Sequence, residues 1–373
     1  MPPHRRWYFA VCQGILTLSA VRIFTILLAS LLVLGACSGD AEVTGNTVNR
    51  QAPSTTAAPT TVPATTTSTT STTTTLPPVV SPLNGLAVED PDLVDRRVIA
   101  VKIDNHWNAR PQSGIENADA VFELLVEADL TRFIAMFHDN DATFLGPMRS
   151  GRPTDPTLIK QTGGTFTISG AQPWVSGVIN RAGVPLIGEV RPATFRISSR
   201  RAPHNLYVDT EQLRVVADDR GYSNEPPPDL FEWGPLTAGG EAATEVFMDW
   251  SSATTVTWVW TGEAYERMLG DVTHNWRSED GETEEPISAD TLIVLFAPRY
   301  WASGSTGSSV PAMDTVGEGI ALVFAEGTVI EGMWARETIE EPFALTDPAG
   351  DTIAVPPGKP WISVFPDSRT VSW

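Results

Sequence analysis

Six arginines, a histidine and an asparagine that could hold an anionic ligand are concentrated between residues 98 and 205 of this acidic chain. They are Arg110, Arg149, Arg152, Arg196, Arg200, Arg201, His204 and Asn205. The planar guanidinium group binds carboxylate or phosphate through two parallel hydrogen bonds, so the set favours a pocket for such a ligand. The alternative is that these arginines neutralise Asp104, Glu123 and Glu127 in the same stretch.

The candidate ligand-binding set combines these cations with the polar residues around them. It comprises Asp104, Asn105, Arg110, Arg132, Arg149, Arg152, Arg200, Arg201, His204 and Asn205. His204 and Asn205 follow Pro203, and a bend there suits a positioned imidazole, although a histidine held in a structural hydrogen bond is more common.

Two glutamates could take part in acid–base chemistry. Glu123 and Glu127 are four residues apart, so they share a face in a strand and also in a helix. Two carboxylates on one face can act as general acid and base or hold a cation. The alternative is a solvated face, or a carboxylate paired with Arg132. The catalytic candidates are therefore Glu123, Glu127 and His204.

Familiar catalytic and cofactor motifs are missing. The sequence contains no G-x-S-x-G, S-x-x-K or H-E-x-x-H motif, and its Gly358-Lys359 pair lacks the upstream glycine of a P-loop. The histidines at 106, 138 and 274 lack metal-ligand spacing, and we expect the acidic turns at 139–141 and 279–282 to be surface loops without calcium. We therefore expect no metal and no cofactor, and a binding protein is favoured over an enzyme.

Composition narrows the choice of partners. The formal net charge is −20 over 373 residues, which argues against nucleic acid as a binding partner and against broad electrostatic adhesion to anionic lipid. The length allows two domains after a leading segment. The two cysteines, Cys12 and Cys37, both precede the expected folded region, which therefore has no disulfide and no thiol nucleophile.

Strands interleaved with helices are expected to position the polar residues. Apolar or β-branched runs predict strands at 97–103, 120–127, 131–137 and 165–169, the second and third joined around 128–130. The alternative for 120–127 is a helix. Helices are expected at 173–181 and 210–219, the second with Thr210 as its N-cap. This order predicts an α/β domain, a mixed sheet with helices, over residues 81–240.

From residue 241 to residue 373 the pattern changes to short apolar runs between Gly, Pro and Asp turns. Runs at 246–250, 255–260, 292–296, 319–324, 329–334 and 361–365 predict strands. We expect a mainly β and mostly antiparallel domain, with several tryptophans in its core or on its faces.

The leading segment indicates export and lipid attachment. Residues 1–36 combine early positive charge with an apolar run that is too short for a comfortable membrane span, and they end in Leu34-Gly35-Ala36 before Cys37. This pattern is typical of a lipoprotein signal, with Cys37 as the lipidated residue. Residues 37–80 follow as a Thr/Pro-rich linker, in which thirteen of the 26 residues 53–78 are threonine, and we expect it to be disordered.

Several long polar motifs resemble those of the YerB-type lipoproteins, domain of unknown function 3048. The first half carries SPLNGL (81–86), VKIDN (101–105), ARPQSG (109–114), ADAVFE (118–123), GPMRS (146–150) and RRAPHNLY (200–207). The second half carries VIEGMW (329–334) and PGKPWI (357–362). The resemblance implies an extracytoplasmic protein, usually a lipoprotein, with two associated domains, and it implies no particular reaction or ligand. Ala128 and Asp129 depart from the glycines that the family often has there.

These observations favour a lipoprotein on the outer face of the cell membrane that binds an anionic envelope component or a partner protein through the first domain. One alternative is an enzyme that acts on a cell-wall polymer, with Glu123 and Glu127 as acid and base. Another is a structural module that docks through tryptophans of the β domain, because aromatic residues are concentrated at interface hot spots.

Overall fold

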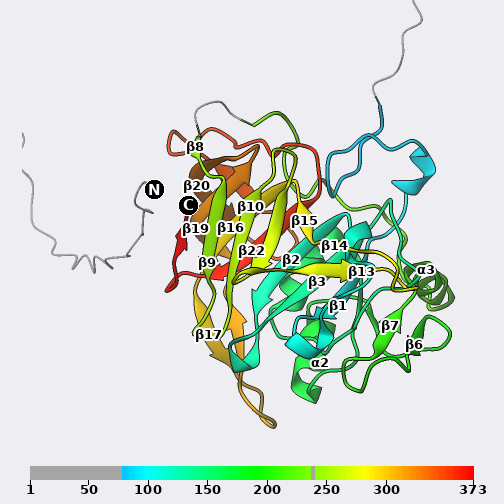
Figure 1. The fold of residues 1–373 in the computed structure, drawn as a ribbon. Coiled ribbons are helices and arrows are strands. Elements are labelled where there is room, and N and C mark those ends of the chain that lie inside the picture. The colour runs from blue at the N-terminus through cyan, green and yellow to red at the C-terminus, as the bar shows by residue number, and fades with distance from the viewer. Residues whose placement is uncertain (1–77, 237–239) are drawn as a thin grey trace, which may run out of the picture. The chain divides into compact units, whose positions relative to one another are not determined.

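One eleven-stranded sheet runs through both halves of the chain in the computed structural model, which describes residues 78–236 and 240–373 (Figure 1). The expected signal segment, Cys37 and the linker up to residue 77 lie outside these described residues. The strands of the sheet are β1 (Ile99–Asp104), β2 (Ala120–Leu125), β3 (Thr131–Phe137), β4 (Thr165–Thr167), β5 (Leu186–Ile187), β8 (Glu241–Ala242), β16 (Thr291–Ala297), β19 (Gly317–Ala325), β20 (Thr328–Arg336), β21 (Ala344–Thr346) and β22 (Pro360–Pro366).

The two halves meet where β2 and β22 pair in the middle of the sheet. The strand order is β21-β20-β19-β16-β22-β2-β3-β1-β4-β5, and β8 pairs with β20. β2 and β22 run parallel, with Val121 opposite Trp361, and β22 is also parallel to β16 (Figure 1). The described second half is mostly antiparallel, as expected, with β16 and β22 as a parallel pair. The boundary predicted at residues 240 and 241 falls between halves that share one sheet.

Both faces of the large sheet are covered, which explains why β1 and β3 consist of buried residues throughout. On one face, Ile99 and Val101 pack in a core that includes a second sheet and helix α3 (Thr210–Asp219). On the other face, Ala100 packs with helices α1 (Asp155–Ile159) and α2 (Pro173–Arg181). The second sheet contains β9 (Glu245–Asp249), β10 (Thr255–Trp260), β11 (Tyr265–Leu269), β12 (Val272–Thr273), β15 (Ser288–Ala289) and β23 (Val371–Ser372).

Three two-stranded ribbons and five short 3-10 turns complete the described residues. The ribbons are β6 (Thr194–Arg196) with β7 (Leu206–Val208), β13 (Asn275–Arg277) with β14 (Glu284–Pro286), and β17 (Arg299–Ala302) with β18 (Val310–Met313). The turns are η1 (Pro91–Leu93), η2 (Trp107–Ala109), η3 (Ile115–Asn117), η4 (Glu127–Asp129) and η5 (Lys160–Thr162). No helix within the described ranges is long and apolar enough to cross a membrane.

Most of the expected elements are present, with one correction to a helix cap. The strands expected at 131–137 and 255–260 and the helix expected at 173–181 have the bounds that the sequence predicts. The N-cap of α3 is Asp209, whose side chain accepts the Gln212 N–H, and not Thr210 as expected. The Thr210 hydroxyl instead donates to Asp141 at 2.7 Å, because this residue is buried against the preceding loop. Four tryptophans (Trp250, Trp258, Trp334 and Trp361) are fully buried, which supports the core interpretation of the tryptophans over the surface one.

Candidate functional site

Asp104, the last residue of β1, brings together a histidine and an arginine from distant loops. Its Oδ2 lies 2.7 Å from Nδ1 of His204 and 3.3 Å from Nε of Arg149, and its Oδ1 accepts the backbone N–H of His106. Because an ionised carboxylate only accepts hydrogen bonds, Nδ1 of His204 carries the proton. Nε2 of His204 has no hydrogen-bond partner in the described part of the chain.

Two further arginines meet on a single backbone oxygen. The carbonyl of Ser150 accepts hydrogen bonds from Nη1 of Arg132 at 2.9 Å and from Nη1 of Arg152 at 3.2 Å. Arg152 also pairs with Glu127 at 2.5 Å, whereas Arg132 forms no ion pair with a carboxylate among the described residues. Burial, followed by repulsion from Arg152, lowers the pKa of Arg132 to about 10. This cluster of Arg132, Arg149 and Arg152 therefore has more positive charge than its immediate carboxylates neutralise.

The topology of the sheet explains why these side chains converge. β1 and β2 are both antiparallel to β3 and hence parallel to each other, so Asp104 at the end of β1 and the turn that contains Glu127 after β2 lie at the carboxyl ends of two strands. Arg132 stands at the same edge, opposite Asp104 in the register of β1 and β3. The carboxyl edge of parallel strands is where open α/β sheets bind ligands.

The loop after β3 places Arg149 beside Asp104. Met148 forms a β-bridge with Ile103, and the N–H of Arg149 donates to the carbonyl of Lys102 at 2.8 Å. The side chain of Arg149 is 24% exposed, and its Nη atoms form no hydrogen bond within residues 78–236 and 240–373. Its Nε is buried and also lacks a hydrogen bond, although it is close to Asp104. Arg149 is thus the arginine of the cluster that the fold leaves least engaged.

Lys102 lies next to this cluster but is already neutralised. Its Nζ is 2.7 Å from Oδ1 of Asp155, and both side chains are completely buried. Burial lowers the pKa of Lys102 to about 8. The other oxygen of Asp155 accepts the N–H of Arg152, so the pair fixes the loop that carries the arginines.

The remaining predicted site residues support this region or lie apart from it. Arg110 donates to the side chain and carbonyl of Asn105, and Arg200 donates to the carbonyls of Asn108 and Pro111. Asn205 accepts from Arg196 at 2.9 Å, and Arg201 is exposed. The structure therefore brings together Asp104, Arg132, Arg149, Arg152 and His204, while the other members of the predicted set hold nearby loops or face solvent.

Glu123 belongs to a separate, fully buried network. Its Oε1 accepts from the hydroxyl of Thr131 and from Nη2 of Arg267, each at 2.6 Å, and its Oε2 accepts the indole N–H of Trp361 at 2.8 Å. Glu123 and Arg267 are both 0% exposed, and the guanidinium carbon of Arg267 lies 5.4 Å from the centre of the Phe133 ring. The geometry gives Glu123 a structural part and leaves it without an accessible oxygen for acid–base catalysis.

The hydrogen-bond direction in this network is fixed by its donors. Arg267 can only donate, so Nδ1 of His274, at 2.6 Å, accepts and Nε2 carries the proton. Nε2 then donates to Oε1 of Gln112, whose amide nitrogen donates to the carbonyl of Asp104 at 2.9 Å. Burial, then the Arg267 charge, lowers the pKa of His274 well below its usual 6.5. A buried polar chain thus joins Glu123 to the backbone of Asp104.

Sequence reasoning did not predict the partners Arg267 and His274. One signal was present, since Arg267 is two residues after the apolar Tyr265 and so shares its strand face. Tyr265 and Arg267 are both buried. A charged residue at an inward-facing position needs a partner of opposite charge. Which carboxylate would meet it depends on contacts across 144 residues.

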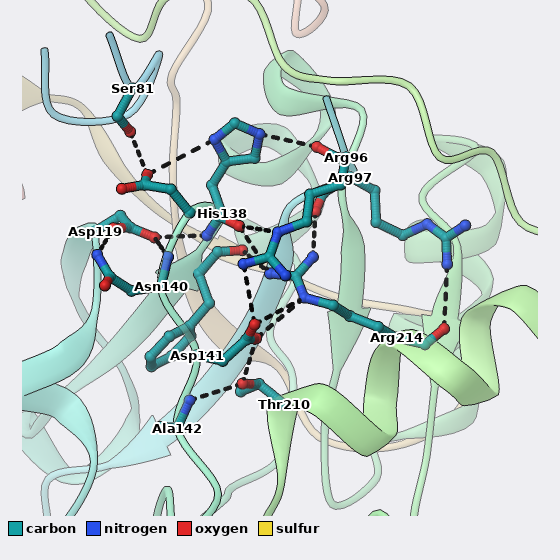
Figure 2. Close-up of polar contacts among 12 residues, drawn as sticks. Ser81, Arg96, Arg97, Asp119, His138, Asn140, Asp141, Ala142, Thr210 and Arg214 are labelled. Carbon is teal, nitrogen blue, oxygen red and sulfur yellow. Dashed lines mark hydrogen bonds and ion pairs between the residues drawn. The ribbon is translucent and has the colours of Figure 1, made fainter. Parts of the chain in front are cut away.

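A second polar network, at the other ends of the strands β2 and β3, holds the start of the folded region (Figure 2). Asp119 accepts hydrogen bonds from the side chains of Asn84 and Asn140 and from the N–H of His138. Burial, then the charge of Asp139, raises the pKa of Asp119 to about 7. The hydroxyl of Ser81 donates to Asp139, so two residues of the SPLNGL motif have a structural explanation.

The first of the two acidic turns lies at the surface with Asn140 exposed, as expected, but its carboxylates are engaged by neighbouring side chains. Asp141 pairs with Arg96 and with Arg214, each at 3.0 Å (Figure 2). The turn at 279–282 is exposed, as expected. No group of three or more histidine, cysteine, aspartate or glutamate side chains in the described ranges could hold a metal ion.

Comparison with known proteins identifies a family for both halves of the chain. Residues 83–223 match the family described as "Protein of unknown function (DUF3048) N-terminal domain", and residues 245–362 match the corresponding C-terminal domain. The "Putative lipoprotein YerB" of Bacillus subtilis (strain 168) is 27% identical over 302 residues, which are 78% of this chain and 88% of that protein.

A solved structure supports the same relationship. The crystal structure of the YerB protein from Bacillus subtilis matches with a TM-score of 0.68 at 25% identity, over 79% of this chain and 100% of the crystallised one. The crystallised chain therefore has this fold but no counterpart to about a fifth of the present chain. The resemblance predicted from the polar motifs is confirmed, and the chain belongs to the DUF3048 family of YerB-like proteins.

Proposed function

We propose that this protein is an extracytoplasmic lipoprotein, attached through Cys37 to the outer face of the cell membrane, that binds an anionic group of an envelope polymer or partner protein. The attachment is supported by the lipoprotein-like sequence around Cys37 and by a relative that is named as a lipoprotein. The Thr/Pro-rich residues 37–80 would carry the folded region away from the lipid surface.

The observation that carries the binding proposal is the unbalanced charge of the arginine cluster. Arg132 and Arg152 share the carbonyl of Ser150, and Arg149 has unpaired Nη atoms at the same sheet edge. The positive charges of Arg149 and Arg152 repel that of Arg132, and such repulsion is strongest where water is partly excluded. A phosphate or carboxylate placed between these side chains would relieve the repulsion and accept charge-assisted hydrogen bonds.

Binding is favoured over acid–base catalysis because of how the glutamates are engaged. Both oxygens of Glu123 accept hydrogen bonds in the core, and Glu127 is paired with Arg152. Glu123 is fully buried without an accessible oxygen, and Glu127, although 35% exposed, is held by Arg152 rather than free to exchange a proton with a ligand. We therefore propose no reaction for this site.

Calorimetric titration with inorganic phosphate and with acetate tests the proposal, using a soluble protein that begins at residue 78. Residues 78–373 belong to one compact unit, and the crystallised relative, which matches 79% of this chain, has the same fold. A charge-assisted hydrogen bond contributes about 1.5–3 kcal/mol, so Arg149→Ala is expected to weaken phosphate binding by roughly tenfold to a hundredfold. Arg369→Ala is the control, because Arg369 is likewise partly exposed, at 34% against 24% for Arg149, and pairs with Asp249 in the second half. Equal phosphate affinity in the wild type and Arg149→Ala, or no heat with either anion, would refute the anion site.

A further inference from the structure

An exposed tryptophan stands beside the arginine cluster, at the end of a short series of rings. The side chain of Trp107 is 65% exposed. Its ring centre lies 3.7 Å from that of His106, which in turn stacks on His204 at 4.7 Å with an angle of 18° between the planes. His204 and Arg149 contact the same oxygen of Asp104, so the series leads from solvent to the arginine cluster.

The turn that presents Trp107 is held in place by local hydrogen bonds. The N–H of His106 donates to Asp104, and Nδ1 of His106 accepts the N–H of Asn108 at 3.1 Å. The carbonyl of Asn108 accepts from Arg200 at 3.3 Å. A side chain on a fixed turn loses little further freedom when a ligand binds, which favours affinity.

Trp107, the outermost ring of this series, offers a flat and uncharged face to solvent, and His106 supports it from behind. Because Nδ1 of His106 accepts a hydrogen bond, its proton is on Nε2. Burial, then the neighbouring His204, lowers the pKa of His106, so this ring is neutral at pH 7. Trp107 adds a large amphipathic face with only two rotatable side-chain bonds. Such a surface suits a ligand with an apolar face and a polar rim.

We propose that Trp107, supported by His106, forms a subsite for a sugar ring beside the arginine cluster, so that the ligand is an anionic glycan. This inference rests on the proposed anion site and adds the chemistry of the group that carries the anion. A pyranose presents C–H groups on its face and hydroxyls around its rim, which match the flat ring and its polar surroundings. The anion is either the phosphate of a glycosyl phosphate or the carboxylate of a uronic acid.

Titrations with inorganic phosphate, glucose 1-phosphate and glucuronate test the inference on the soluble protein that begins at residue 78. Glucose 1-phosphate is expected to bind at least fivefold more tightly than phosphate, and its affinity relative to glucuronate distinguishes the two sources of the anion. Trp107→Ala is expected to remove the preference for glucose 1-phosphate and to leave the phosphate affinity within twofold. Trp107→Tyr should keep most of the preference. Trp301→Ala is the matched control, because Trp301 is 62% exposed on β17 and is expected to have no effect.

Each outcome separates the glycan inference from the anion site itself. Equal affinities for phosphate and glucose 1-phosphate in the wild type would overturn the sugar subsite and leave the anion site standing. Loss of phosphate binding in Trp107→Ala, with an unchanged unfolding midpoint, would also overturn it, because Trp107 would then serve the anion directly. Tighter, Trp107-dependent binding of adenosine monophosphate would assign the rings to a base, which stacks on aromatic residues equally well. No binding of any anion would refute the proposed function and this inference together.

Discussion

Replacing Glu123 with glutamine should destabilise the folded protein strongly, although the two side chains have nearly the same shape. Glu123 accepts three hydrogen bonds, from Thr131, Arg267 and Trp361. Glutamine has one oxygen and one NH₂ group in their place. If the amide oxygen faces Thr131 and Arg267, its NH₂ group meets the indole N–H of Trp361. If it is turned around, the NH₂ group meets the other two donors.

The magnitude follows from the burial of Arg267. Arg267 is 0% exposed, and Glu123 is its ion-pair partner in the described structure. Removing one member of a buried pair leaves the other charge uncompensated, which costs about 3–5 kcal/mol. Whole-protein stabilities are about 5–15 kcal/mol, so the variant should lose a large fraction of its free energy of unfolding.

Urea unfolding of the soluble protein measures this loss from the midpoint and the slope. Glu127→Gln is the matched control, four residues along the same segment. The side chain of Glu127 is 35% exposed and pairs with Arg152 at the surface, so its substitution should cost about 0–1 kcal/mol. A loss below about 1 kcal/mol for Glu123→Gln would refute the structural assignment of Glu123, and a similar loss in both variants would refute the contrast between them.

Two further predictions concern acid stability and lipid attachment. The pKa of His274 in the folded protein is well below 6.5, so below pH 6.5 the unfolded chain binds a proton at His274 that the folded protein does not bind. The stability that neutral His274 contributes is therefore present above pH 6.5 and is lost as the pH falls below it. At pH 5.5 this loss should be about 1.4 kcal/mol. His274→Gln should reduce by that amount the difference in unfolding free energy between pH 7.5 and pH 5.5. An unchanged difference would contradict the assignment of His274 as neutral in the folded protein. Cys37→Ser should move the exported full-length protein from the membrane fraction to the soluble fraction, because a serine hydroxyl cannot form the thioether to the lipid. Retention of this variant in the membrane fraction would contradict attachment through Cys37.

Local patterns in the sequence predicted many of the helices and strands. The apolar periods of α2 and the alternation in β10 determined their bounds, because each element buries its face whatever lies beyond it. The Thr210 cap was mistaken because two cap-forming residues are adjacent, and only the loop around Asp141 decides between them. Part of the candidate site was predictable for the same reason, since Asp104 comes directly after the strand expected at 97–103 and Arg132 is the second residue of the strand expected at 131–137.

What the sequence could not provide was the pairing of distant segments. The residues of β22 form an apolar run that would fit an antiparallel or a parallel neighbour, and they lie beside β2 from the other half of the chain. The partners of Glu123 depend on that pairing, because Trp361 lies on β22 and Arg267 on β11. A buried charge indicates that a partner exists, but periodicity does not identify it.

The buried network also suggests why the two halves occur together. Gln112 binds the carbonyl of Asp104 in the candidate site and is itself held by His274 from the second half. His274 accepts from Arg267, which binds Glu123, so each hydrogen bond in this chain fixes the direction of the next. We infer that the second half supports the geometry of a site whose ligand-facing residues all come from the first. Under this interpretation, Glu123→Gln should weaken phosphate binding even under conditions in which the variant stays folded. Unchanged phosphate affinity in that variant would show that the network stabilises the fold without shaping the site.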